Sequence, residues 1–486
     1  MSAEHQITTL DSGVRVVSER VPGVRSVALG MWVATGSVAE REDQAGISHL
    51  LEHMLFRGSA RFGSQEIDEI FDAMGAEINA GTDKETTSLY TRVLDRHLER
   101  AFEVMSDMLW QPRFGELEAE REVVLEEIAM YEDDPQDRVF DVLGRAIFGV
   151  HPLGRAVIGN AETVRAVTRE QLAEFHAQRY RPHDVVIAAA GSIDHDALVQ
   201  MACAAASSPE EPAGQGDTAA ATAPGEGSGA SQPQDASGTR NGAAPVPAVP
   251  RAPDFERRAR FLEKDTEQYH VCVGGAGIAR DDERRYALRV LEGVLGGTTS
   301  SRLFQEVRER RGLAYSVFTF ANLYAHTGEI GLYVGTRPDN LRQALAVIAA
   351  ELERCVEDPA SEEELVRSRE NLKGRVVLGM ESTGARMSRL GASVLHGLPI
   401  LSMNEMIERI DAVDIDQVRA LAAGLFTPSQ LSAAGVGPAE TEFLAAIEPL
   451  GGAAAELAAS SPSGDAPSPY GDVPAQGAAS ASRARR

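Results

Sequence analysis

The chain contains two long segments that repeat one another, and this repeat limits the possible folds more than any other feature of its 486 residues. The segments span residues 1–203 and 255–450. "HLLEHMLFRGS" at residue 49 corresponds to "RVLEGVLGGTT" at residue 289, and the helical pattern "LERAFEVMSDML" corresponds to "LRQALAVIAAEL". Glu52 and Glu292 are 240 residues apart, and Gly191 and Gly437 are 246 apart. Such a steady offset indicates a duplicated unit.

Each copy combines helical segments with hairpin-like strands. A glycine leads into alternating residues in "GAEINAGTDKETTSLYTRV" of the first copy and again in "GLAYSVFTFANLYAHTGEIGLYV" of the second. We therefore predict an α+β fold of two homologous halves, each a mostly antiparallel sheet covered by helices.

Two further segments have a composition that does not suit a packed core. Residues 204–254 are rich in Pro, Gly, Ala and Ser, and between Ala204 and Pro250 there is no Leu, Ile, Phe, Tyr or Trp. Such a stretch buries too little apolar surface to offset the entropy lost on ordering. We predict a disordered linker over 204–254 and a disordered tail over 451–486.

Charge and hydropathy exclude several classes of partner. The formal net charge is -26 and the pI is near 4.9, so the surface repels nucleic-acid phosphates. No apolar run is long enough to span a membrane, and the start lacks the pattern of a signal or transit peptide. The three cysteines form no CxxC pair. We expect a cytoplasmic protein that binds neither nucleic acid nor membrane.

The stretch "GISHLLEHMLFRG" predicts a metal site on a helix. His49 and His53 are four residues apart and so lie on one helix face, while Glu52 flanks the point at which both imidazoles aim. A catalytic zinc needs neutral nitrogens and a carboxylate that takes a proton from water. HxxEH is also the inverted form of the zinc peptidase motif. The alternative is that both histidines are incidental residues of a helix.

An open zinc site needs a third protein ligand, and "EAEREVVLEEIAMYEDD" is its best source. Glu120 and Glu127 are seven residues apart and share one helix face. Glu127 is then the third ligand, and Glu120 orients an imidazole N–H. Glu126 is a rival to Glu127, and a solvated acidic helix face is the alternative for the whole run.

The second copy has lost these candidate ligands together. Arg289 and Gly293 stand where the first copy has His49 and His53, and Arg375 stands where it has Glu127. Joint loss is expected of residues that form one functional unit, so the repeat favours Glu127 and a real metal site.

With these motifs the chain resembles the pitrilysin and mitochondrial processing peptidase family, in particular its bacterial single-chain members. The resemblance covers nearly all of both halves. It implies that His49, His53 and Glu127 bind one zinc ion and that Glu52 is the general base. Ligation by two histidines and a glutamate also suits zinc best among divalent ions.

The resemblance also implies residues that bind substrate. Arg308 and Tyr315 in "EVRERRGLAYSV" match an Arg and a Tyr that bind substrate in the family, and a Tyr hydroxyl can donate to the oxyanion on a scissile carbonyl. Without the family, a basic helix end followed by a strand aromatic would be the plain interpretation. Asn79 and Ala80 match the strand edge along which a peptide is laid by backbone hydrogen bonds.

The resemblance implies a zinc endopeptidase that cleaves oligopeptides or unfolded, presequence-like polypeptides inside a closed chamber. Four units enclose such a chamber in the family, so a chain with two units is expected to form a homodimer. Two alternatives remain: a non-catalytic partner or scaffold subunit, although such members usually have a damaged HxxEH, and a metal-dependent hydrolase that acts on something other than peptides.

Overall fold

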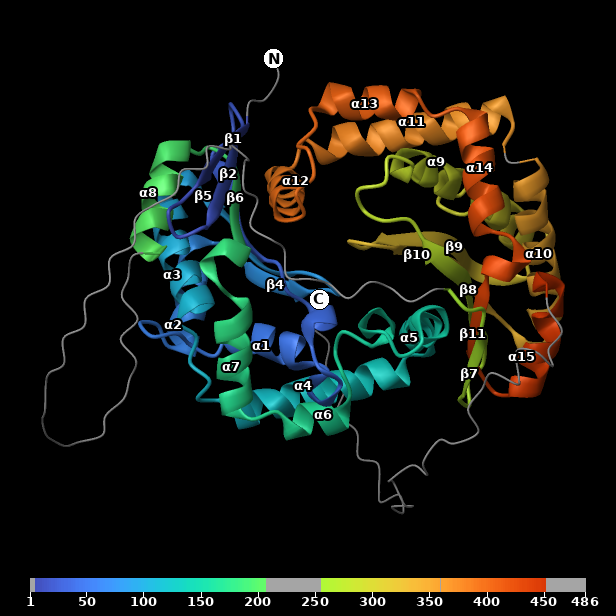
Figure 1. Ribbon diagram of the computed structural model, residues 1–486, viewed down its shortest axis with the longest axis horizontal. Coiled ribbons are helices and arrows are strands. Elements are labelled where there is room, and N and C mark those ends of the chain that lie inside the picture. Colours follow the sequence, from blue (N-terminus) through green and yellow to red (C-terminus); the bar gives the residue numbers. More distant parts are fainter. Residues whose placement is uncertain (1–4, 207–254, 359, 452–486) are drawn as a thin grey trace, which may run out of the picture.

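The computed structural model describes residues 5–206, 255–358 and 360–451. The predicted linker, beyond the last turn of its preceding helix, and the predicted tail after Gly451 lie outside the described residues. Figure 1 shows two halves on opposite sides of the molecule, each with a sheet flanked by helices. Among the described residues, no helix combines the length and the apolar character needed to cross a bilayer.

The first half contains a six-stranded sheet in the order β1-β2-β6-β3-β5-β4. Its neighbouring strands run antiparallel, except for the parallel pair β2–β6. The strands are β1 (His5–Thr9), β2 (Arg15–Arg20), β3 (Ser26–Val33), β4 (Ile78–Thr82), β5 (Thr87–Leu94) and β6 (Val185–Gly191).

The second half repeats this topology. Its five-stranded sheet has the order β7-β11-β8-β10-β9, with one parallel pair, β7–β11. Strand for strand, this is the order β2-β6-β3-β5-β4 of the first sheet, and β1 is the one addition. The predicted fold class is confirmed. The strands are β7 (Ala259–Glu263), β8 (Tyr269–Gly277), β9 (Ala314–Leu323), β10 (Gly328–Thr336) and β11 (Ser432–Gly437).

The helices follow the same duplication. Those of the first half are α1 (Ile47–Leu55), α2 (Ser64–Met74), α3 (Leu98–Trp110), α4 (Leu117–Asp133), α5 (Pro135–Phe148), α6 (Ala161–Ala166), α7 (Arg169–Arg179) and α8 (His195–Ala206). Those of the second half are α9 (Arg285–Leu295), α10 (Leu341–Glu357), α11 (Glu362–Gly379), α12 (Thr383–Leu395), α13 (Met403–Asp411), α14 (Ile415–Leu425) and α15 (Glu440–Ala446).

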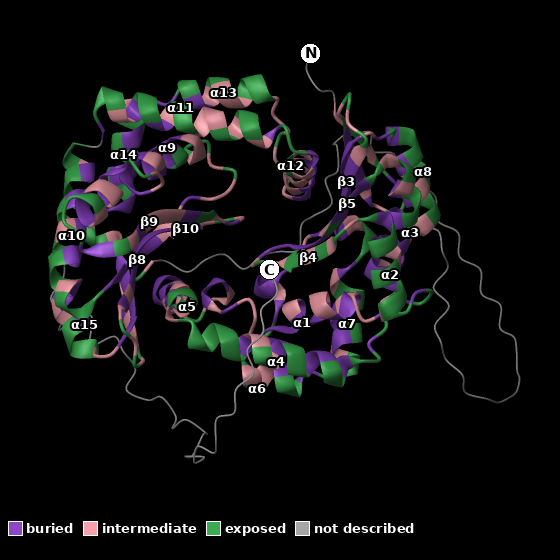
Figure 2. Cartoon of the chain, turned by 180° about the vertical axis from the view of Figure 1, so that it is seen from behind, coloured by how far each residue is buried: buried purple, intermediate pink, exposed green. Residues whose placement is uncertain are grey.

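One helix of each half packs on the sheet of the other half. Helix α5 contacts β7, β8 and β11, and α12 contacts β2, β3 and β6 (Figure 1). Apolar side chains fill both contacts: Leu143 and Ile147 of α5 pack near Cys272, while Leu390 of α12 packs near Val186. Figure 2 shows buried residues, in purple, along these strands and on the helices that meet them.

An ion cluster holds α12 on the first sheet. Glu19 of β2 is 1% exposed and pairs with Arg386 and, at 2.9 Å, with Arg389 Nη2, both on α12. A buried carboxylate is costly unless it is paired and hydrogen-bonded, so two guanidinium groups on one carboxylate fix where this helix docks.

Two glycines allow α12 to pack closely against the first sheet. A Cβ added at Gly391 of α12 would lie 2.5 Å from Cδ1 of Trp32 on β3 and nearer still to its Nε1. Opposite, a Cβ at Gly30 would lie 2.9 Å from Trp32 Nε1 and nearer to the sulfur of Met387. The indole therefore fills the space that side chains at these positions would need.

We expect Gly391→Ala to lower the free energy of unfolding by about 1–3 kcal/mol, because overpacking must displace Trp32 or α12. Gly374→Ala, on α11 with open space around it, is the matched control and should raise stability by up to about 1 kcal/mol through helix propensity. Denaturant unfolding of both variants measures this. Equal effects of the two substitutions would contradict the close docking.

Candidate metal centre

Helix α1 begins at a buried glycine in a conformation that other residues rarely adopt. Gly46 precedes it with φ +94°, and a Cβ there would lie 2.6 Å from the carbonyl oxygen of Ile158. The buried carboxylate of Glu40 accepts hydrogen bonds from the amides of Gly46 and Ser48, both at 2.9 Å. Burial raises the pKa of Glu40 to about 7. These bonds satisfy amides at the helix start and fix where the next turn, with His49, points.

Three predicted ligands converge between α1 and α4. One carboxylate oxygen of Glu127 lies 3.7 Å from Nε2 of His49 and 3.4 Å from Nε2 of His53. The three ligand atoms lie within 4.8 Å of one another. Ligands at zinc bond lengths in a tetrahedral site are about 3.4 Å apart, so the arrangement needs little adjustment. Glu126 is exposed, so the choice of Glu127 is the one that agrees with the geometry.

Glu120 lies directly beside the imidazole of His53. Its carboxylate lies 2.7 Å from Nδ1 of His53, which leaves Nε2 facing Glu127. The second oxygen of Glu120 accepts a hydrogen bond from Nε of Arg57. Sequence analysis missed Arg57, which lies four residues after His53 and two residues beyond the end of α1. Together these contacts fix the ring orientation and the tautomer of the ligand.

The charges of the two imidazoles differ. Burial, with a contribution from His53, lowers the pKa of His49 to about 4, so His49 is neutral at pH 7 with a lone pair for a metal. Burial also lowers the pKa of His53, but the hydrogen bond and charge of Glu120 and the charges of Glu127 and Glu52 outweigh it and raise this pKa. The carboxylates that raise the pKa of His53 would also favour a divalent cation at this point.

The group has the features of a metal site rather than of a closed ion network. Nδ1 of His49 and Oε2 of Glu52 are buried without a hydrogen-bond partner. Burial raises the pKa of Glu52, and the hydroxyl and amide of Thr82, beside it, lower it in part. A carboxylate with one free oxygen next to three converging ligands can accept a proton from a water held there. The residues fit a zinc ion.

The second half has an internal ion cluster at the equivalent place. Nη1 of Arg289 lies 2.8 Å from Oε2 of Glu292, and Arg375 contributes a favourable charge to the same carboxylate. A Cβ at Gly293 would collide with the hydroxyl oxygen of Ser368, the residue that corresponds to Glu120. Guanidinium groups thus occupy the place of the cation, and the loss of ligands in the second copy is confirmed.

A cavity of about 420 Å³ adjoins the metal group, and both halves line it. The first half contributes His49, Glu127, Lys84 and Asp141. The second half contributes Asn322, Tyr324 and Glu329 from β9, β10 and the turn between them. Sequence analysis missed these wall residues, because no local pattern marks them.

The other predicted site residues lie outside this cavity. Nη1 of Arg308 donates to the carbonyl oxygen of Tyr315 at 2.9 Å, and its guanidinium lies 4.6 Å from the centre of that ring. Tyr315 is 77% exposed. Asn79 and Ala80 lie on β4, which is an outer strand of the first sheet with β5 as its only described neighbour. Their roles with substrate stay predictions.

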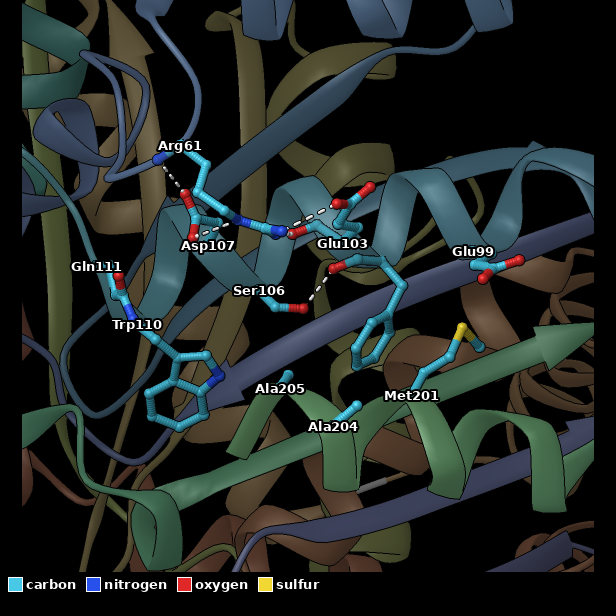
Figure 3. Close-up of a pocket in the computed structure, with 11 residues that line it drawn as sticks. Arg61, Glu99, Glu103, Ser106, Asp107, Trp110, Gln111, Met201, Ala204 and Ala205 are labelled. Carbon is cyan, nitrogen blue, oxygen red and sulfur yellow. Dashed lines mark hydrogen bonds and ion pairs between the residues drawn. The ribbon is translucent and has the colours of Figure 1, made fainter. Parts of the chain in front are cut away.

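A larger cavity of about 520 Å³ lies between α3 and α8 (Figure 3). Two of its three carboxylates are already paired, because Arg61 donates to Asp107 at 3.1 Å and to Glu103 at 3.0 Å. Within the described part of the chain, the one group of three residues able to hold a metal is His49, His53 and Glu127. The smaller cavity is therefore the candidate site.

We expect Glu120→Gln to weaken metal binding about 10- to 100-fold while the protein stays folded, because the imidazole loses its charged partner. Glu118→Gln is the matched control, because Glu118 is an exposed carboxylate of the same helix that pairs with Arg121 and not with His53. Equilibrium dialysis against zinc measures both affinities. Unchanged affinity in Glu120→Gln would contradict the role of Glu120.

Comparison with known proteins agrees with this geometry. Residues 15–161 match the family described as Insulinase (Peptidase family M16), and residues 166–372 match the Peptidase M16 inactive domain. An uncharacterized zinc protease of Streptomyces coelicolor is 40% identical over 421 residues, which cover 85% of this chain and 86% of that protein.

Solved structures share the fold. A protease from Helicobacter pylori superposes with a TM-score of 0.79 at 18% identity, covering 90% of this chain and 100% of the other. A peptidase M16 inactive domain from Pseudomonas fluorescens gives 0.77 at 21% identity, covering 90% and 98%. Family matches along both halves, a relative at 40% identity and the His-His-Glu group together confirm the predicted metallopeptidase class: the chain belongs to peptidase family M16.

Proposed function

We propose that the protein is a zinc-dependent endopeptidase that cleaves oligopeptides or unfolded polypeptides. The observation that carries this proposal is the convergence of two imidazoles and the Glu127 carboxylate beside Glu52, one of whose carboxylate oxygens has no hydrogen-bond partner. Zinc is the proposed ion because two histidines and a glutamate suit it, and the Streptomyces coelicolor relative is named a zinc protease. Bound zinc supplies a Lewis acid and a water of lowered pKa.

Glu52 has the central role among the protein groups. Its carboxylate removes a proton from the attacking water and later delivers it to the departing amine. Tyr315 is proposed to donate its hydroxyl hydrogen to the oxyanion, and Arg308 to bind substrate oxygens. The substrate is proposed to lie along β4, where backbone groups of Asn79 and Ala80 hold an extended chain without reading its side chains.

The cavity beside the metal group favours a basic side chain in the substrate. Apart from Glu127, its charged wall residues are Asp137, Asp141, Glu329 and Lys84: three carboxylates and one ammonium group. Asp141 pairs with Arg138 at 3.3 Å, and the charge of Lys84 favours both Asp141 and Glu329. Burial still raises the pKa of both carboxyl groups, so a further cation beside them would stabilise their charged forms. An arginine or lysine of the substrate would supply that cation.

The proposed assembly is a homodimer. This chain carries both the metal group and the Arg308–Tyr315 pair. A different partner chain is therefore not needed to supply either, and a second copy of the same chain is the simpler partner. Two copies would give the four units that a closed chamber needs, and such a chamber would admit short or unfolded chains.

We expect Glu52→Gln to lower kcat for a quenched fluorescent peptide by at least about 10³-fold, because the amide cannot accept the proton. Metal content measured on the dialysed variant should stay at the wild-type level. Chelation of the wild-type protein should also stop cleavage, and added zinc should restore it. Full cleavage by Glu52→Gln would exclude Glu52 as the base.

We expect peptides with one arginine near the scissile bond to be cleaved faster than the same peptides with glutamine there. Asp141→Asn should lower kcat/KM for the arginine peptide about tenfold, the effect of a lost charge-assisted hydrogen bond. The glutamine peptide should be cleaved equally by both proteins and is the internal control. A parallel loss for both peptides would contradict recognition of charge in this cavity.

A further inference from the structure

Two turns that correspond to one another in the two halves meet beside the cavity. Residues 83–86 connect β4 to β5, and residues 324–327 connect β9 to β10, the equivalent strands of the second sheet. The first turn belongs to the half that carries the metal group. The second belongs to the half whose own site is filled by an ion cluster.

Glu85 joins the two turns. Its carboxylate accepts a hydrogen bond from the amide of Ala325, with oxygens at 3.0 and 3.1 Å, and another from Nη2 of Arg280 at 2.6 Å. The Glu85 side chain is 4% exposed. Arg280 is tied to the same second-half turn, because its amide donates to the carbonyl oxygen of Tyr324 at 2.8 Å. We call these bonds the Glu85 contact.

The first turn is internally rigid. The Asp83 amide donates to the Thr86 carbonyl oxygen at 2.8 Å, and one Asp83 carboxylate oxygen accepts from the amides of Glu85 and Thr86, both at 2.8 Å. The carbonyl oxygens of Asp83 and Lys84 accept from Ser37 and Val38. These bonds couple Glu85 to Asp83, the residue that directly follows Thr82.

Thr82 connects this turn to the proposed base. It is the last residue of β4, and its hydroxyl and amide lie beside the Glu52 carboxylate, which has one oxygen without a hydrogen-bond partner. Thr82 is the neighbour that offers both a hydroxyl and an amide to the Glu52 carboxylate, so the position of Thr82 matters to it. On the other side of the contact, Tyr324 directly precedes Ala325 and lines the cavity.

We propose that Glu85 is a positioning residue for the reaction: through its bonds to Ala325 and Arg280, the second half of the chain sets Thr82 and thereby the carboxylate of Glu52. The proposal rests on the proposed function, in which Glu52 is the base. It gives the second half, beyond the proposed roles of Arg308 and Tyr315, an indirect part in placing the base.

The test compares Glu85→Gln with Glu19→Gln. Glutamine keeps an oxygen for the Ala325 amide but loses the charge that pairs with Arg280, so the turn is loosened without a cavity. Glu19 is the matched control, because its buried carboxylate also joins the two halves, through Arg386 and Arg389 of α12, without contacting the turn at 83–86.

For Glu85→Gln we expect kcat for the quenched peptide to fall about 10- to 100-fold, because small misplacement of a reacting group is costly. KM should stay within about threefold, because β4 remains paired with β5 under the substrate. Zinc content should be unchanged, and hydrogen–deuterium exchange should rise in the peptide spanning residues 78–94. Arg280→Gln should act in the same way, and the double variant should be no slower than either single one.

The control separates positioning from stability. Glu19→Gln should lower Tm at least as far as Glu85→Gln and leave kcat per folded, zinc-loaded molecule unchanged. Equal losses of kcat in the two variants, or a wild-type kcat in Glu85→Gln, would overturn the proposal. If the wild-type protein cleaves no peptide, the proposed function fails instead, and the exchange measurement still shows whether the Glu85 contact holds the turn.

Discussion

The exchange of α5 and α12 between the two sheets is the packing on which the rest of the structure depends. Each sheet has its own helices on one face and a helix of the other half against the opposite face. A sheet face built from residues such as Val186 and Ala188 must be covered by apolar side chains, and neither half supplies that cover for itself. Catalysis therefore takes place in a molecule whose halves complete each other.

The two halves show how one scaffold supports a metal site in one copy and excludes it in the other. In the first copy, His53 has room for its ring and Glu120 as partner. In the second, Gly293 and Ser368 close that space, and Arg375 brings a positive charge where a cation would lie. The inert copy keeps the helix packing and instead contributes a cavity wall and the Glu85 contact.

Much of the site could be predicted from the sequence because its rules are local. The spacing of His49 and His53 places them on one helix face. Comparison with the second copy favoured Glu127 over Glu126. The cavity wall at Tyr324 and Glu329 could not be predicted, since only the tertiary fold brings β9 and β10 to the metal group. Glu85 lies in a polar turn, where a carboxylate is normally solvated, so its burial had no local signal.

The fold was predictable to a similar degree. Alternating residues and helical spacing predicted the α+β class. Corresponding segments predicted the duplication, which the shared order of five strands in the two sheets confirms. The parallel pairs β2–β6 and β7–β11 were not foreseen, because periodicity does not report strand direction. Nor does an amphipathic helix reveal which sheet it will cover, so the destination of α5 and α12 depended on long-range packing.

The exchange of α5 and α12 also has a consequence for assembly from separate polypeptides. Because α5 and α12 are embedded in opposite halves, the packing surfaces described above lie within residues 5–206 and 255–451. Residues 207–254 join these two parts along the chain. Two separately translated polypeptides, divided there, would have the same surfaces with which to assemble as a heterodimer.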